Sequence, residues 1–453
     1  DKEYEVYTKE RLLEAIEKGK TIRRAYIPTL VFPEVCASKV EILNSVIDWA
    51  DIRNSYFEGN VSFKGSHFLN KVTVKNSKFC GNFHCQRAKF LGGGDFSETE
   101  FLKEVNFNGA HFERYVTWRK SKFQGRAIFA KVNFQKGASF LGSTFHGETS
   151  FSEAFSGYRF TLSKCHFQKA LRLSNATFED LCDFSESRYS GETNIIRVHF
   201  KHPVKFYNSL FEDNVSIRGS YFEKDAFFQD VEFAGKTDFS GVQGEGNFFF
   251  QGMKPHLTAS FRFSHVNIKR MFLERSQLEG FIHSHRQGNY EEAQKEYGLL
   301  KNNFREINSY GDEDWAYYME KRMARFALPT GLEYPISSIR RFFEWIALDA
   351  GCGYGTKPLN IFFASMLMIA LFASLYLLFP GAFEGPPGMD GSSSFGFVDA
   401  FVTSFKTFAG SEVGEWHPKA TYPAMTLLVM FESFLGIFIM TVLVVTFSRK
   451  VIR

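Results

Sequence analysis

The feature that most constrains this chain is a phenylalanine that returns every eleven residues between Phe57 and Phe233. Fifteen of the seventeen positions in this series are Phe. A second series runs from Phe63 to Phe272 with the same period, and all twenty of its positions are apolar. The two series alternate spacings of six and five residues, so an α-helix of 3.6 residues per turn cannot keep both on one face.

A small or β-branched residue stands two positions before each Phe of the first series, as Ser66, Ser77 and Ala88 do. One large and one small inward residue per side would fill a narrow tube layer by layer. Gly and Asn at the intervening positions suit tight corners. The pattern therefore predicts a β-solenoid whose coils stack about 4.8 Å apart.

This eleven-residue repeat resembles the eleven-residue variant of the pentapeptide-repeat family. The resemblance implies a right-handed quadrilateral β-helix over residues 40–280, with ten or eleven coils and a length of about 50 Å. We expect residues 1–39 to cap its first coil, with a short helix near residues 8–17. In this interpretation the Phe side chains are core residues and carry no ligand.

The charge balance argues against a nucleic-acid partner. Lys and Arg number 54 and Asp and Glu number 50, which gives a net charge of +4. The six Cys are scattered and form no zinc or disulfide framework, which favours a reducing compartment. We find no P-loop, nucleophile elbow or pair of catalytic carboxylates. We therefore expect no enzyme activity and no resident cofactor or metal; a cytoplasmic protein or ligand could bind the solenoid.

Helical spacing replaces the Phe beat after Gly280. Residues 281–335 predict a helical hairpin that connects the solenoid to the rest of the chain. Residues 336–356 predict a helix and a turn, and Arg340 and Arg341 stand there beside bulky apolar residues. Such a helix suits the interface between lipid and water.

Residues 357–453 predict a domain with two membrane spans, at 359–379 and 420–447. Lys and Arg cluster before the first span and after the second, whereas the loop between them is mainly acidic. The positive-inside rule then places both termini and the solenoid in the cytoplasm. We expect a multi-pass protein of the cell membrane, in a prokaryote the inner membrane.

The loop between the spans contains a second apolar stretch that is too short to cross a bilayer. The apolar stretch occupies residues 397–408. Together with the polar residues that follow it, up to residue 418, it resembles the pore helix and filter of two-span potassium-channel-like proteins. Ser404, Thr407, Gly414 and Pro418 match the family pattern, and Glu415 takes the place of its acidic residue. The resemblance implies a homotetramer, since one two-span chain cannot enclose a pore.

The departures from that pattern argue against a potassium filter. Gly410 and Ser411 replace the Thr-Val pair, and Glu412 stands where the first filter Gly belongs. Glu suits the backbone angles of a filter glycine poorly. We expect four copies of Glu412 to form a carboxylate ring that attracts cations such as Na⁺ or Ca²⁺. The predicted filter and its support comprise Gly410, Ser411, Glu412, Val413, Gly414 and Glu415, with Ser404, Lys406 and Thr407 behind them.

Three positions keep two interpretations each. Glu415 either forms an ion pair with Lys406 behind the filter or lies at the mouth of the pore. Glu432, inside the second span, either lines a cavity or finds a partner behind the pore. Gly436 is either a hinge or a point of close helix packing.

The leading functional hypothesis is a tetrameric cation channel in the lipid membrane, gated or localised by cytoplasmic solenoids. The alternative is a membrane-tethered scaffold whose solenoid binds a protein partner without conductance. The stretch from Ser404 to Pro418 distinguishes the two hypotheses, because a plain anchor needs no amphiphilic segment between its spans.

Overall fold

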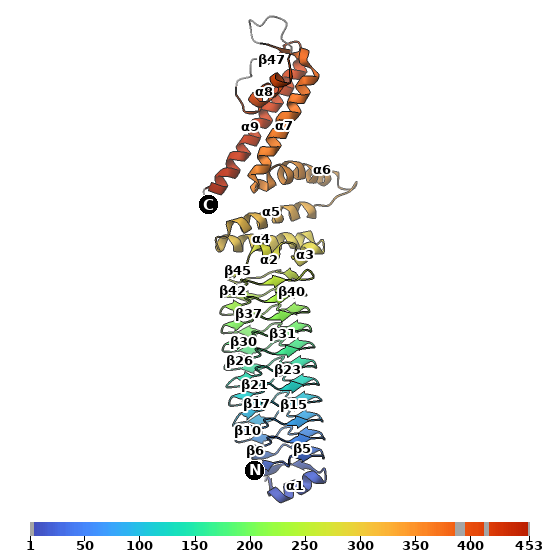
Figure 1. Cartoon of the computed structure of the whole chain (residues 1–453), viewed down its shortest axis with the longest axis vertical. Helices are drawn as coiled ribbons and strands as arrows, with labels where there is room; N and C mark the ends of the chain where they lie inside the picture. Colours follow the sequence, from blue (N-terminus) through green and yellow to red (C-terminus); the bar gives the residue numbers. More distant parts are fainter. Residues whose placement is uncertain (1–3, 386–394, 412–415, 452–453) are drawn as a thin grey trace. The chain divides into compact units, whose positions relative to one another are not determined.

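The computed structural model describes residues 4–385, 395–411 and 416–451. The chain divides into two compact units, Asp1–Asn308 and Ser309–Arg453. The regular structure of the first unit is mainly strand, and that of the second is mainly helix (Figure 1).

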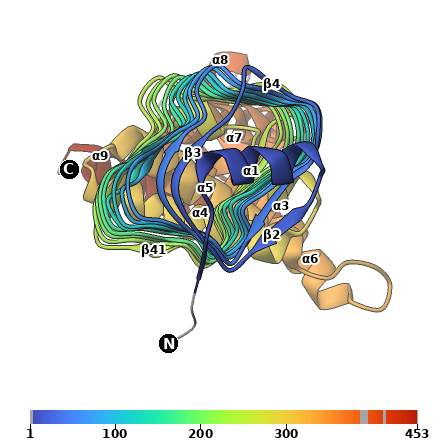
Figure 2. The same ribbon diagram turned by 90° about the horizontal axis from the view of Figure 1, so that it is seen from below.

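The first unit is a β-solenoid with a four-sided outline (Figure 2). Among the described residues, one sheet has twelve strands and another eleven, and a third with twenty-two covers the two remaining faces. Every neighbouring pair in these sheets is parallel; Lys78 pairs with Glu100, and Glu100 with Lys122. Each coil thus takes twenty-two residues, or two beats of eleven. One coil contains β15 (Glu100–Phe101), β16 (Val105–Asn106), β17 (His111–Phe112) and β18 (Val116–Thr117).

The core consists of aromatic columns that run along the solenoid. Because a coil spans two beats, alternate Phe residues of one series fall on opposite sides. Phe101, Phe123 and Phe145 form one column, with ring centroids 5.2 Å and 4.6 Å apart and rings nearly parallel. Phe90 and Phe112 stack in the opposite column at 4.4 Å. The predicted solenoid and its Phe core are confirmed.

The small residues before each Phe do more than make room. The Ser121 hydroxyl donates to the Phe96 carbonyl at 2.7 Å and accepts from the Thr99 backbone N–H of the preceding coil at 3.3 Å. Ser143 repeats the pattern one coil later, with the Trp118 carbonyl and the Ser121 backbone N–H. These hydroxyls satisfy backbone groups at the corners, where the two-residue strands end.

The solenoid begins before residue 40, the boundary that the Phe series predicts. Strand β2 (Thr21–Arg23) pairs with β5 (Val40–Leu43), and β3 (Ala25–Val31) pairs with β6 (Val46–Asp51). Ile and Leu fill the inward positions of this first coil, so a search for Phe does not detect it. Helix α1 (Lys9–Glu17) lies across the open end and buries two apolar residues (Figure 2).

The coil lengthens at the other end. Lys236 pairs with Ser260, twenty-four residues on, and Asn247 pairs with Arg270, twenty-three residues on. The frame shifts as a result, so that Met271 is buried and Phe272, the last position of the predicted series, faces outward. The short helices α2 (Arg275–Leu278) and α3 (His283–Arg286) follow, and α4 (Tyr290–Glu306) closes this end.

The second unit begins with α5 (Tyr310–Ala327) and α6 (Pro335–Phe343). A π-helical stretch (Glu344–Ala350) and a 3₁₀ turn (Gly353–Gly355) lead to α7 (Pro358–Leu378). Then come a second 3₁₀ turn (Pro380–Ala382), β46 (Phe383–Glu384), α8 (Phe397–Phe408), β47 (His417–Pro418) and α9 (Pro423–Val451). Among the described residues, α7 and α9 are long and apolar enough to cross a membrane.

Candidate functional site

The candidate site lies where the short helix α8 packs between the two long helices α7 and α9 (Figure 1). Helix α8 begins after Gly396, whose backbone N–H donates to the Asp399 carboxylate at 2.9 Å. It ends after twelve residues, and Gly410 follows with a φ of +70°. The twelve residues rise about 18 Å, too little to cross a hydrocarbon layer of about 30 Å.

Helix α8 reaches the middle of both long helices. Near its C-terminal end, the Ser404 hydroxyl lies 2.9 Å from the carbonyl of Ile369, nine residues before the end of α7. The Phe408 carbonyl lies beside Gly436, thirteen residues after the start of α9. At 1.5 Å per residue these contacts lie about 14 Å and about 20 Å from the ends of α7 and α9 that face the connecting loop.

A β-clasp holds those loop-facing ends together. Strand β46 pairs antiparallel with β47, so Phe383 lies opposite Pro418 and Glu384 opposite His417. The Lys419 ammonium donates to the Gly381 carbonyl at 2.8 Å. The chain therefore leaves α7 and enters α9 at the same end. Helix α8, which lies between them in the sequence, runs from that end toward the middle of α7 and α9.

Glu432 joins the three helices. Its side chain is fully buried, and its carboxyl group is hydrogen bonded by the Tyr376 hydroxyl from α7 and the Ser404 hydroxyl from α8. Each carboxyl oxygen therefore has one hydroxyl partner, which offsets part of the cost of removing the group from water. Glu432 is therefore a partnered group within the chain, and its position behind a pore stays a prediction.

At Gly436 the backbones of α9 and α8 lie very close together. A Cβ atom at this position would lie 2.1 Å from the Phe408 carbonyl oxygen and 2.8 Å from the Phe408 Cα. No side chain fits in that space, so a glycine is required for α8 to sit at this depth. The contact corresponds to the close-packing interpretation of Gly436.

The predicted filter falls largely outside the described residues. Glu412, Val413, Gly414 and Glu415 belong to that part, and so does the proposed pair between Lys406 and Glu415. Gly410 and Ser411 are exposed at the end of α8, where the Ser411 N–H and hydroxyl both bond the Lys406 carbonyl.

The residues predicted to support the filter lie on α8 itself. Ser404 and Thr407 are buried against the long helices, and Lys406 is half-buried. Within the described part of the chain, the Thr407 hydroxyl has no hydrogen-bond partner. No group of three or more His, Cys, Asp or Glu gathers there as a metal site.

The outer faces of the three helices are apolar and exposed. Only 33% of the apolar stretch of α7 and 17% of that of α9 are buried within the chain. On α8, Phe397, Val398 and Phe405 are exposed as well. A core helix of a soluble protein is mostly buried, so these faces need lipid or further protein to cover them.

A buried ion pair lies near the other end of α7. The Arg325 guanidinium on α5 bonds the Asp349 carboxylate, and both side chains are almost inaccessible. The Tyr318 hydroxyl donates to the same carboxylate at 2.6 Å, and burial and this bond raise the pKa of Tyr318 to about 12. Lys357, which precedes α7, lies over the Tyr318 ring at 3.9 Å. The cluster fastens α5 to the start of α7.

Comparison with known families identifies the repeat. Residues 52–100, 96–144 and 107–154 match the family model described as pentapeptide repeats (9 copies). Residues 52–154 of the solenoid are therefore built from pentapeptide repeats. The matched residues lie in its regular middle part, where every coil takes twenty-two residues. A search of curated proteins and a search of solved structures found no match.

Sequence reasoning missed Tyr376 and the pair of Arg325 with Asp349. A signal for Tyr376 existed, because Glu432 needs hydroxyl or amide partners inside an apolar layer and few residues of the first span carry one. Arg325 is one of the basic residues before the first span that the positive-inside rule counted as exposed, whereas its side chain is buried.

Proposed function

We propose that the second unit is embedded in a membrane and that four copies of the chain form a cation-conducting pore. The observation that carries the proposal is the depth of α8, a helix too short to span that ends beside the middle of two spanning helices. A plain two-helix anchor has no use for such an element. In a symmetric assembly, the ends of four α8 helices would converge around a common axis.

The chemistry of the converging segment favours cations. The C-terminal end of a helix carries a partial negative charge, so four α8 ends would lower the energy of a cation on the axis. Glu412 follows two residues after Gly410 in the sequence and adds a carboxylate per copy. A potassium-type filter is not part of the proposal, for the reasons drawn from Gly410, Ser411 and Glu412.

The clasp of β46 and β47 then lies on the outer side of the membrane, and the pentapeptide-repeat solenoid lies in the cytoplasm. The charge distribution supports this topology through the positive-inside rule. The solenoid would gate or localise the pore. In this proposal the chain performs no catalysis.

Ion flux in reconstituted liposomes tests the proposal. The full chain is expected to pass monovalent or divalent cations, and Glu412→Gln is expected to lower their permeation relative to anions. Glu384→Gln is the matched control, since Glu384 lies in the same loop but belongs to the clasp and is exposed. Equal permeation ratios for the native chain and both variants would remove Glu412 from the pore.

The alternative, a membrane-tethered scaffold, predicts a different outcome. Liposomes that hold the correctly oriented, folded chain would then show no cation flux at any voltage or pH. That result would contradict the channel proposal and leave the solenoid as the functional part of the protein.

A further inference from the structure

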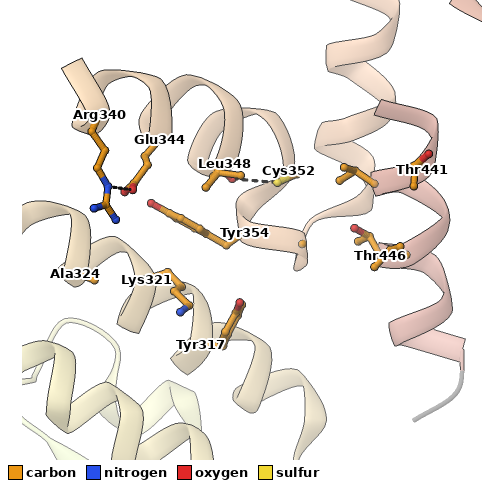
Figure 3. A pocket seen from close by; sticks show the side chains of 13 residues that line it. Tyr317, Lys321, Ala324, Arg340, Glu344, Leu348, Cys352, Tyr354, Thr441 and Thr446 are labelled. Carbon is orange, nitrogen blue, oxygen red and sulfur yellow. Dashed lines mark hydrogen bonds and ion pairs between the residues drawn. The ribbon is translucent and has the colours of Figure 1, made fainter. Parts of the chain in front are cut away.

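A groove of about 540 Å³ opens in the second unit at the end of α9 that is remote from the clasp (Figure 3). Its walls come from α5, from the segment of α6 and the π-helical stretch, and from α9. On α9 it is lined by Thr441, Val442, Val445 and Thr446. These residues lie eighteen to twenty-three positions after Pro423, or about 27 to 35 Å along the helix. That distance equals the thickness of the hydrocarbon layer, so the groove lies where acyl chains meet headgroups.

The lining changes in character across the groove. Val442 and Val445 on α9, together with Leu348, form an apolar side. Lys321 and Arg340 form a basic side and come from different helices (Figure 3). The rings of Tyr317 and Tyr354 also line the groove. An apolar wall that passes into a basic one matches a molecule with a hydrocarbon tail and an anionic head.

The side chains of Lys321 and Arg340 have N–H groups that form no hydrogen bond within the described part of the chain. Lys321 forms no ion pair with any described carboxylate, and its ammonium lies 5.5 Å from the centre of the Tyr317 ring. Arg340 bonds Glu344 through Nε at 2.7 Å, and its two Nη groups bond nothing in the described part of the chain. Glu344 also lines the groove, so Lys321, Arg340 and Glu344 together leave one net positive charge. A phosphate that Lys321 and the Arg340 Nη groups hold would complete the arrangement.

We propose that this groove binds one anionic phospholipid, with its phosphate between Lys321 and Arg340 and an acyl chain along Val442 and Val445 of α9. Because the groove joins α5 to the end of α9, the bound lipid would fasten the juxtamembrane helices to the second span. The inference rests on the membrane embedding proposed above and does not depend on conductance.

Native mass spectrometry of the full chain, titrated with phosphatidylglycerol or phosphatidylcholine in detergent, tests the site. The native chain is expected to retain phosphatidylglycerol in preference. The double variant Lys321→Gln with Arg340→Gln is expected to bind it about 25-fold more weakly, since each of the two cations near a lipid headgroup contributes about fivefold. The conservative pair Lys321→Arg with Arg340→Lys is expected to keep most of the affinity.

Arg341→Gln is the matched control, because Arg341 is adjacent but its guanidinium lies over the Phe326 ring at 5.3 Å. An equal loss with Arg341→Gln would indicate bulk charge attraction and overturn the site. Glycerol phosphate, which has the head without the tail, is expected to compete poorly; equal competition would reduce the groove to an anion site. Unchanged binding in the double variant would also refute the proposal. Retained cation flux in a variant without lipid binding would leave the channel proposal standing.

Discussion

Glu432 is the only acidic residue in α9, and its burial requires partners. Hydroxyl groups from two other helices supply them, Tyr376 from α7 and Ser404 from α8. A carboxyl group in an apolar layer is costly without such bonds. At the scale of single residues, one acidic group therefore fixes the register of α8 against both long helices.

Gly436 gives the sharpest residue-scale prediction. In Gly436→Ala the new methyl group would meet the Phe408 carbonyl at 2.1 Å, so α8 must move away from α9. We expect a loss of about 2 kcal/mol in the free energy of unfolding, as for other overpacked sites. Unfolding of the purified chain in detergent measures it.

Gly311→Ala is the control for helix propensity. Gly311 lies in the first turn of α5, and a Cβ there would meet nothing within 4 Å. Its effect should stay within about 1 kcal/mol. A Gly436→Ala variant as stable as Gly311→Ala would mean that α8 does not press against α9 at this point.

At the scale of elements, α4 closes the last coil of the solenoid with side chains that replace a missing strand. The Asn303 amide accepts from the Met271 N–H at 2.7 Å and donates to the Met271 carbonyl at 2.9 Å. Glu296 Oε1 accepts from the Phe263 N–H at 2.8 Å. Exposed strand edges recruit other chains, so these bonds protect the solenoid from aggregation.

Glu296 on the same helix should make the stability of the chain depend on pH. Burial raises the pKa of Glu296 to about 7, above its unfolded value of 4.5. The folded state thus binds the proton more tightly, and this contribution to stability is full below about pH 4.5 and is lost as the pH rises to about 7. Compared with Glu296→Gln, the native chain should lose about 3 kcal/mol over that interval. Thermal unfolding followed at a series of pH values tests this.

Glu291→Gln is the matched control for that experiment, because Glu291 is an exposed carboxylate on the same helix. It should keep the native pH profile. If the native chain and Glu296→Gln show parallel profiles, Glu296 does not titrate in the way described.

The aromatic columns make a second element-scale prediction. Phe123→Ala removes a fully buried ring from between two stacked neighbours and should cost about 4 kcal/mol. Phe227→Ala removes a half-buried ring on the outer face, 5.1 Å from Phe249, and should cost about 1 kcal/mol. Denaturant unfolding compares the two variants, and equal costs would contradict the assignment of the inner and outer faces.

At the scale of the whole molecule, the features best predicted from the sequence are those that a repeated pattern of residues specifies. The eleven-residue period of Phe cannot lie on one face of an α-helix and fits a stack of coils, so the solenoid and its core could be predicted. Ile22, Ile27 and Leu30 fill the core of the first coil in place of Phe. Because they do not continue the eleven-residue Phe series, the sequence did not predict that coil. Likewise, the apolar lengths of α7 and α9 were readable from hydropathy.

The candidate site was only partly predictable. Ser404, Glu432 and Gly436 stood out in the sequence, but their relation depends on how three helices pack. The partner of Glu432 lies fifty-six residues away at Tyr376, and the neighbour of Gly436 is a backbone carbonyl at Phe408. Contacts of that kind follow from tertiary geometry and leave no local pattern.

The central claim is that the end of α8 lies within the membrane and borders an aqueous path for cations. The double variant Ser411→Cys with Cys80→Ser tests this claim. Cys80 is the half-buried cysteine of the six and the other five are buried, so the cysteine placed at position 411 is the one that a reagent can reach. A thiol reagent that cannot cross lipid, added to liposomes from the side of the clasp, is expected to label the new cysteine and block cation flux. Labelling that leaves the flux unchanged, or folded chains without flux before labelling, would contradict the account.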